Sequence, residues 1–156
     1  MMRAVNQPSR SRQRGTAAVE AAIALPVALF LMLAGAELGR VISQYNTLTK
    51  TARDACRYVA ANAGVGSTGI VSITPQLQTA AANLVVTGNV NGTGNALLPG
   101  LAAGNVTVSD LGGGFVSVSV TYTYQPMLGS KLPTFGFGTA ASLAVPLNTA
   151  IVMRAL

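Results

Sequence analysis

One run of residues limits most strongly what this chain can fold into. Residues 21–36 (AAIALPVALFLMLAGA) contain sixteen positions without a charged or strongly polar side chain. A helix needs about 20 apolar residues to cross the core of a bilayer. Extending the run back to Thr16 gives 21 residues, or roughly 31 Å of helix, and the extension includes Glu20. The sequence therefore predicts a single membrane-spanning helix that carries a carboxylate near its start.

The positive charge of the chain is concentrated at the N-terminus. The net charge is +6, and four arginines precede Gly15, namely Arg3, Arg10, Arg12 and Arg14. Arginines beside a span remain on the cytoplasmic side. This predicts a single-pass membrane protein with a cytoplasmic N-terminus and an extracytoplasmic C-terminal part. A nucleic-acid surface needs basic residues clustered on a folded face, so we expect no nucleic-acid partner.

A secretory signal peptide is an alternative for this segment, because Ala34, Gly35 and Ala36 are similar to the small-residue site that ends one. The apolar run instead continues into a helical pattern. Its apolar residues recur at spacings of three and four, at Val41, Tyr45, Leu48, Ala52, Ala55 and Val59. This stripe predicts that the helix extends over residues 16–63 and packs its second half on a small domain.

Residues 64–156 indicate that domain. Thr74 and Pro75 predict the start of a second helix, which ends near residue 85. Alternating residues predict strands over 105–110, 115–124 and 142–154, with a Gly-rich hairpin loop at 110–114 and an ordered loop over 125–138. Pro146 indicates a sheet edge or a bulge. We expect an α+β fold in which a long N-terminal helix, a short second helix and a three-stranded antiparallel sheet pack together.

The composition argues against catalysis and metal binding. The chain has no His and no Trp, which excludes a histidine-based catalyst or metal site. Paired carboxylates and an activated nucleophile are also missing from the pattern. We therefore expect no enzyme, no catalytic residue, no metal and no cofactor. Cys56 is the only cysteine, so it is either a small packed helix residue or the site of an intermolecular disulfide.

Four motifs lie in the N-terminal segment: RGTAAVE at 14–20, ALP at 24–26, ELGR at 37–40 and ARDACRYVA at 52–60. In combination they resemble the TadE-like family of minor pilins, or pseudopilins, of tight-adherence (Flp-type) pili. Ala21 departs from the pattern, because many prepilins have Phe or Tyr there. The resemblance implies a type IV pilin-like fold with a basic leader over 1–15, a long helix over 16–63 and a globular region over 64–156.

The resemblance also implies a processing step. A membrane-embedded aspartyl prepilin peptidase would cut between Gly15 and Thr16 and remove the leader with Arg10, Arg12 and Arg14. Its other implied partners are pilins, pseudopilins and the pilus assembly machinery. A glycine before the cut suits a narrow protease subsite.

Glu20 is the sharpest signal that the residues give by themselves. A carboxylate in an apolar span costs a few kcal/mol unless it is paired. Cleavage would create a partner, the α-amine of Thr16, and in a filament that amine could belong to a neighbouring subunit. Alternatively, the Glu20 side chain reaches the lipid headgroups at the start of the helix.

The far boundary of the span leaves two interpretations open. Glu37, Gly39 and Arg40 form a juxtamembrane motif that either anchors the helix at the interface or contacts assembly partners.

Pro26, inside the span, removes one backbone hydrogen bond, so it either kinks the helix or loosens it during extraction from the membrane.

Two functions compete at this point. The first is a minor pilin or pseudopilin that helps to assemble a tight-adherence pilus and is processed by a prepilin peptidase. The second is an unprocessed, single-pass inner-membrane protein whose outer domain binds envelope partners. The N-terminal residue separates them, since Thr16 indicates the first and Met1 the second.

Overall fold

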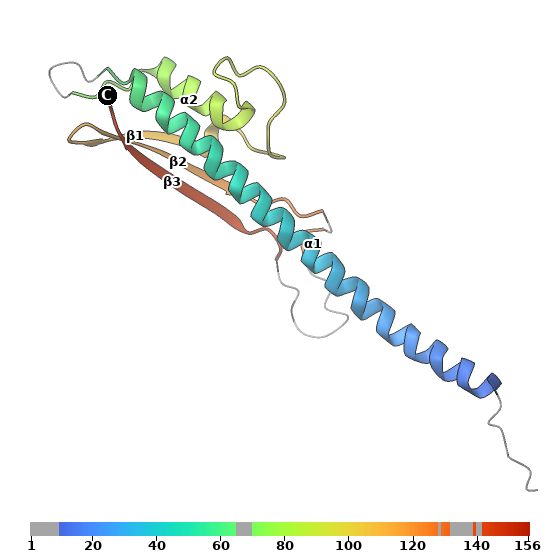
Figure 1. Cartoon of the computed structure of the whole chain (residues 1–156). Coiled ribbons are helices and arrows are strands. Elements are labelled where there is room, and N and C mark those ends of the chain that lie inside the picture. Colours follow the sequence, from blue (N-terminus) through green and yellow to red (C-terminus); the bar gives the residue numbers. More distant parts are fainter. Residues whose placement is uncertain (1–9, 65–69, 128, 132–138, 140–141) are drawn as a thin grey trace, which may run out of the picture. The chain divides into compact units, whose positions relative to one another are not determined.

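The computed structural model describes residues 10–64, 70–127, 129–131, 139 and 142–156, with side chains from residue 15 onward. Its main elements follow the chain in the order shown in Figure 1: α1 (Arg10–Asn62), α2 (Pro75–Thr87), β1 (Val106–Gly112), β2 (Phe115–Thr123) and β3 (Pro146–Arg154). A 3₁₀ turn, η2 (Ala103–Asn105), precedes β1. The α+β fold with one long helix, one short helix and three antiparallel strands is confirmed.

The chain divides into two compact units, Met1–Gly39 and Arg40–Leu156. Each is described by itself below. The proposed division into a leader over 1–15, a helix over 16–63 and a globular region over 64–156 stays a prediction.

In the first unit, α1 begins at Arg10, which is earlier than the expected start at Thr16. Arg and Gln are good helix formers, so the residues before Gly15 have no helix-breaking signal. The part of the expected leader over 1–9 lies outside the described residues. Pro26 lies inside α1. Large apolar side chains on this part of the helix are exposed, including Val19, Ile23, Leu25, Val27, Leu29, Leu31 and Met32.

In the second unit, the sheet has the order β1-β2-β3 with antiparallel pairing throughout. The alternation predicted for β2 is confirmed, because every second side chain enters the core. The core-facing residues are Val116, Val118, Val120, Tyr122 and Tyr124, each at most 2% exposed. Ser117, Ser119 and Thr121 face the other way on the alternating strand. Val118 pairs with Val108 of β1 and Ile151 of β3, which sets the register on both sides.

The C-terminal part of α1 lies against this sheet (Figure 1). Four residues of the predicted stripe are completely buried there: Leu48, Ala52, Ala55 and Val59. The prediction was wrong for Tyr45, which is 43% exposed, whereas the neighbouring Gln44 is 8% exposed. The amide side chain of Gln44, rather than the ring of Tyr45, therefore enters the edge of the core. A hydrogen bond from Tyr122 to Gln44, described below, explains this arrangement.

The second helix begins and ends as its sequence signals predict. Oγ1 of Thr74 accepts a hydrogen bond from the Leu77 N–H (3.2 Å), and Pro75 occupies the first turn. The helix ends at Gly88, whose φ of 73° is left-handed and whose N–H donates to the Leu84 carbonyl. This end lies slightly beyond the expected residue 85.

The last strand is shorter than predicted. It begins at Pro146 rather than near Ser142, so Leu143 and Val145 are not part of it. Pro146 is the first residue of an edge strand, which is where its missing N–H does least harm. Residues 132–138 of the predicted ordered loop lie outside the described residues.

The C-terminal residues after β3 remain tied to the rest of the unit. The Ala155 N–H donates to the Gly114 carbonyl (2.8 Å), at the hairpin between β1 and β2. The Leu156 N–H donates to the Ala60 carbonyl of α1 (3.0 Å). Ala155 and Leu156 thus join the hairpin and α1 at one end of the layer formed by helix and sheet.

Candidate processing and assembly site

The predicted cleavage bond lies inside α1. Gly15 and Thr16 are both exposed helical residues, and a Cβ added at Gly15 would meet nothing within 4 Å. Packing within the chain therefore gives no reason for a glycine at this position. Glycine is about 1 kcal/mol less favourable in a helix than alanine, so α1 unwinds more easily at this position. The side chains of Arg10, Arg12 and Arg14 lie outside the described ones.

Glu20 lies on one exposed face of the same helix. It is the single ionisable group lining a shallow surface groove whose other residues are Ile23, Ala24, Val27, Ala28 and Leu31. These residues recur at helical spacing, so they form one continuous stripe. The groove is apolar except at its Glu20 end. A carboxylate thus stands beside a surface that favours lipid or another apolar helix.

The length and hydropathy of this segment suit a membrane. Among the described residues, one helical stretch, Gly15–Asn62, is long and apolar enough to cross a bilayer. Its most apolar window has a mean hydropathy of 2.2, and no residue of that window is buried inside the structure. The apolar surface is therefore available to lipid or to neighbouring helices.

The juxtamembrane motif has mixed exposure. Glu37 is only 6% exposed, Gly39 is exposed with open space around it, and Arg40 is partly buried. The three residues of the motif are therefore not equally exposed to the surroundings. Whether it anchors the helix or contacts partners stays a prediction.

A polar contact between α1 and β2 lies next to this motif in sequence. The hydroxyl of Tyr122 lies 3.2 Å from Oε1 of Gln44 and 2.9 Å from the Pro99 carbonyl, and it donates to these acceptors. Burial raises the pKa of the Tyr122 phenol, while a backbone hydrogen bond from Gln125 and the positive charge of Arg40 oppose the rise. Sequence reasoning missed this cluster. The available signal was a tyrosine at a core-facing strand position, since a buried phenol needs a polar partner.

Cys56 is buried in the core rather than exposed on the surface. It is 0% exposed, and its thiol donates to the Ile151 carbonyl at 3.3 Å, with the Val116 carbonyl at 3.9 Å. Burial raises the pKa of the thiol, opposed by hydrogen bonds from the backbone of Val118 and Met153. This environment favours the packed-residue interpretation over an intermolecular disulfide.

Metal ligands do not gather in the part of the chain that the structure describes, since no three His, Cys, Asp or Glu side chains lie together there. The described geometry offers surfaces and a carboxylate on an apolar helix. The exposed apolar side chains of this helix are available for contact with lipid or with another apolar surface.

An exposed apolar N-terminal helix, a second helix and a three-stranded antiparallel sheet define a pilin-like α+β protein. The family model described as TadE-like protein matches residues 15–57, so this segment is similar to that family, and residues 58–156 lie outside the match. Searches of curated proteins and of solved structures found no match.

Proposed function

We propose that this chain is a non-enzymatic minor pilin or pseudopilin that takes part in assembly of a tight-adherence, type IVb-like pilus. The proposal rests on one observation: the segment that matches the family model includes the exposed apolar part of α1. The match begins at Gly15, where the predicted cleavage site lies, and leaves the leader arginines outside. Uncovered apolar side chains on this helix need lipid before assembly and neighbouring helices after it.

Processing would change the chemistry of the helix start. Cleavage between Gly15 and Thr16 removes four arginines and creates a positively charged α-amine at Thr16. Glu20 lies one helical turn further along, at the end of its apolar groove. In a low-dielectric surrounding, a carboxylate and an ammonium stabilise each other strongly at short distance. A neighbouring subunit's amine placed next to Glu20 would stabilise the packed helices in one axial register.

The orientation follows from the charge asymmetry. Before cleavage the arginine-rich leader would stay in the cytoplasm, and residues beyond the span would fold outside the inner membrane. The apolar face of α1 would hold the subunit in the bilayer until the assembly machinery extracts it. Partners in this proposal are the prepilin peptidase, other pilins or pseudopilins and that machinery.

N-terminal sequencing of the protein from membrane and sheared-pilus fractions tests the proposal. Thr16 as the first residue in either fraction supports processing, and its presence in the pilus fraction supports incorporation. Met1 as the first residue in both fractions would overturn the proposal in favour of an unprocessed single-pass membrane protein.

A further inference from the structure

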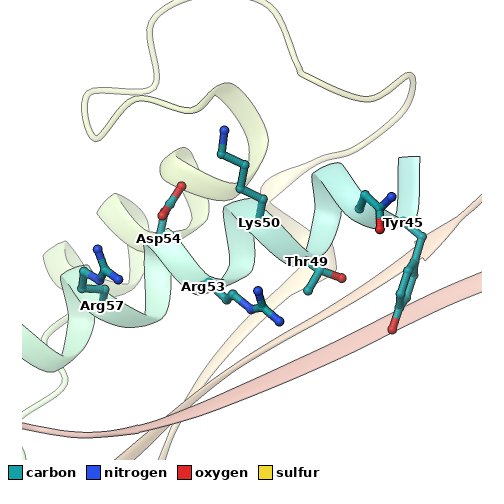
Figure 2. A pocket seen from close by; sticks show the side chains of 7 residues that line it. Tyr45, Thr49, Lys50, Arg53, Asp54 and Arg57 are labelled. Atoms are coloured by element: carbon teal, nitrogen blue, oxygen red, sulfur yellow. The ribbon is translucent and has the colours of Figure 1, made fainter. Parts of the chain in front are cut away.

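A second exposed surface lies on α1, in the unit formed by Arg40–Leu156. It is a shallow groove along the face of the helix, lined chiefly by Tyr45, Thr49, Lys50, Arg53, Asp54 and Arg57. Figure 2 shows these side chains projecting from the helix, with Lys50, Asp54 and Arg57 toward one side and Arg53 toward the other. We call this surface the basic groove. It carries three cationic side chains and one carboxylate.

Among the described residues, the cations of the basic groove have no ion-pair partner. Lys50 and Asp54 have the spacing of a helix-surface ion pair, yet the described part of the chain contains no ion pair between them, nor one at Arg53 or Arg57. Lys50, Arg53 and Arg57 follow each other at helical spacings of three and four. Like charges at these spacings destabilise a helix by a few tenths of a kcal/mol per pair. The arrangement therefore works against the stability of the isolated chain.

Thr49, one of the residues that line the groove, has an unsatisfied polar atom. Oγ1 of Thr49 is shielded from solvent and, within the described residues, has no hydrogen-bond partner. Buried hydroxyls are nearly always bonded, and an orphan one costs about 1–3 kcal/mol. Because this hydroxyl is shielded, the case for a bound partner rests on the unpaired charges of the groove.

We infer that the basic groove docks an acidic surface of a different protein, such as a helix or loop carrying Asp or Glu side chains. A second copy of this chain does not fit, because residues 40–156 contain six basic residues and only Asp54 and Asp110 as acidic ones. The Asp110 carboxylate also already accepts the Gly112 N–H at 2.8 Å. Two copies would therefore meet mainly with like charges.

Asp54 distinguishes a protein partner from a uniform polyanion. It stands among Lys50, Arg53 and Arg57, so a row of phosphates laid along the groove would meet repulsion at that point. A protein surface can instead offer carboxylates to the cations and an amide or ammonium donor to Asp54. The basic groove also lies within the matched family segment, which ends at Arg57. The inference concerns a surface apart from the cleavage site, so it does not depend on processing.

Peptide binding to the full chain in detergent tests the inference. The probe is a fluorescein-labelled helical peptide with four Glu residues on one face, and the reference is the same peptide with Gln at those positions. We expect the Glu peptide to bind more tightly, with an affinity that falls as NaCl rises from 50 to 300 mM, because exposed charge pairs are screened. Equal binding of the two peptides would overturn the inference.

Two variants that remove the same charge provide the matched comparison. Lys50→Gln/Arg57→Gln should weaken binding of the Glu peptide by about three- to tenfold, as expected for two exposed ion pairs. Lys131→Gln/Arg154→Gln removes two exposed charges elsewhere in the unit and should leave the affinity within about twofold. Equal weakening by both variants would show that net charge alone attracts the peptide, and the basic groove would lose its role.

Three further measurements distinguish the acidic protein surface from other occupants. An Asp54→Asn variant should bind the Glu peptide more tightly than the wild type, because a repulsive charge is removed. A single-stranded oligonucleotide that binds the wild type more tightly than the Glu peptide does would replace the inference with a nucleic-acid surface. Self-association that is lost in Lys50→Gln/Arg57→Gln would replace it with a contact between copies. Circular dichroism of each variant checks that the fold is retained, since all these side chains are exposed.

Discussion

The hydroxyl of Tyr122 and Oε1 of Gln44 lie 3.2 Å apart, although 78 positions separate the two residues in the chain. This contact joins the central strand to α1 at the edge of the core, and the Pro99 carbonyl completes it at 2.9 Å. It also explains why Gln44 rather than Tyr45 turns toward the sheet. The packing of helix on sheet is thus oriented by a buried polar contact as well as by apolar surface.

Removing the phenol oxygen should destabilise the folded unit. Tyr122→Phe leaves the Gln44 and Pro99 acceptors in a buried place without their donor, which costs about 1–3 kcal/mol. Urea denaturation of the full chain in mild detergent measures the change in the free energy of unfolding. Tyr45→Phe, at a side chain that is 43% exposed, is the control and should change this free energy by less than about 0.5 kcal/mol. A Tyr122 variant as stable as the control would contradict the role given to this contact.

The two glycines at positions 100 and 104 should respond differently to alanine. Gly100 has a φ of +76°, and a Cβ there would collide with the side-chain amide of Gln125, whereas Gly104 has open space and no positive φ. Gly100→Ala should therefore lower the free energy of unfolding by about 1 kcal/mol or more. Gly104→Ala should be close to neutral. The same denaturation assay applies, and equal effects at both positions would contradict the local backbone geometry.

Stability should fall at alkaline pH because two buried acids resist ionisation. Burial raises the pKa of Cys56 above its ordinary value of 9.0 and that of Tyr122 above 10.0. A raised pKa in the folded state gives stability that is complete below the unfolded pKa and is lost as pH rises through the folded pKa. The free energy of unfolding should thus decline above about pH 9. Cys56→Ala should shift the onset of this decline toward the range of the phenol, and an unchanged pH profile would rule out the thiol as a contributor.

Substitution of Gly15 tests the processing site. With the peptidase present, Gly15→Leu should accumulate as the unprocessed, slower-migrating species on a gel, because a bulky side chain would not fit the subsite before the cut. Gly35→Leu is the matched control, since Gly35 is also an exposed α1 glycine with nothing within 4 Å of an added Cβ. Normal mature product from Gly15→Leu would refute the assignment of the cleavage bond.

Glu20 tests the pairing model. Glu20→Ala and Glu20→Gln should insert into the membrane normally but enter sheared pili poorly, because the α-amine of a neighbour would lack its counterion. Charged groups in a span differ from neutral ones by about 2.5–3.5 kcal/mol on insertion scales, so a loss of incorporation of about tenfold or more is expected. Val19→Ala alters a neighbouring exposed side chain and should incorporate as the wild type does. Quantitative blotting of pilus and membrane fractions gives both values, and full incorporation of Glu20→Gln would eliminate the pairing model.

Local signals made much of the fold predictable. The alternation from Val116 to Tyr124 depends on one strand with one buried face, and the Thr74 cap with Pro75 depends on a single helical turn. Tyr45 was assigned to the wrong side because the buried position of its neighbour Gln44 depends on Tyr122, which is distant in sequence. The early start of α1 at Arg10 escaped prediction because basic residues indicate a leader and also favour helix.

The candidate site was also only partly predictable from the sequence. Gly15 and Glu20 stand out in the sequence because a glycine beside arginines and a carboxylate in an apolar run break the surrounding pattern. Their roles depend on groups that other chains would supply, so the geometry of one chain shows only their exposure. The unpaired cations of the basic groove became visible only when the structure placed Lys50 and Asp54 on one helix without an ion pair.

The bonds of Ala155 and Leu156 to Gly114 and Ala60 have a practical consequence for labelling this protein in cells. A bulky epitope or fluorophore placed next to Leu156 would crowd the two hydrogen bonds that hold these residues to the hairpin and to α1. A tag inserted at the exposed Gly94, in the turn-rich segment after α2, should leave these bonds intact. Imaging of the subunit in membranes and pili is therefore better designed around that internal position than around the chain end.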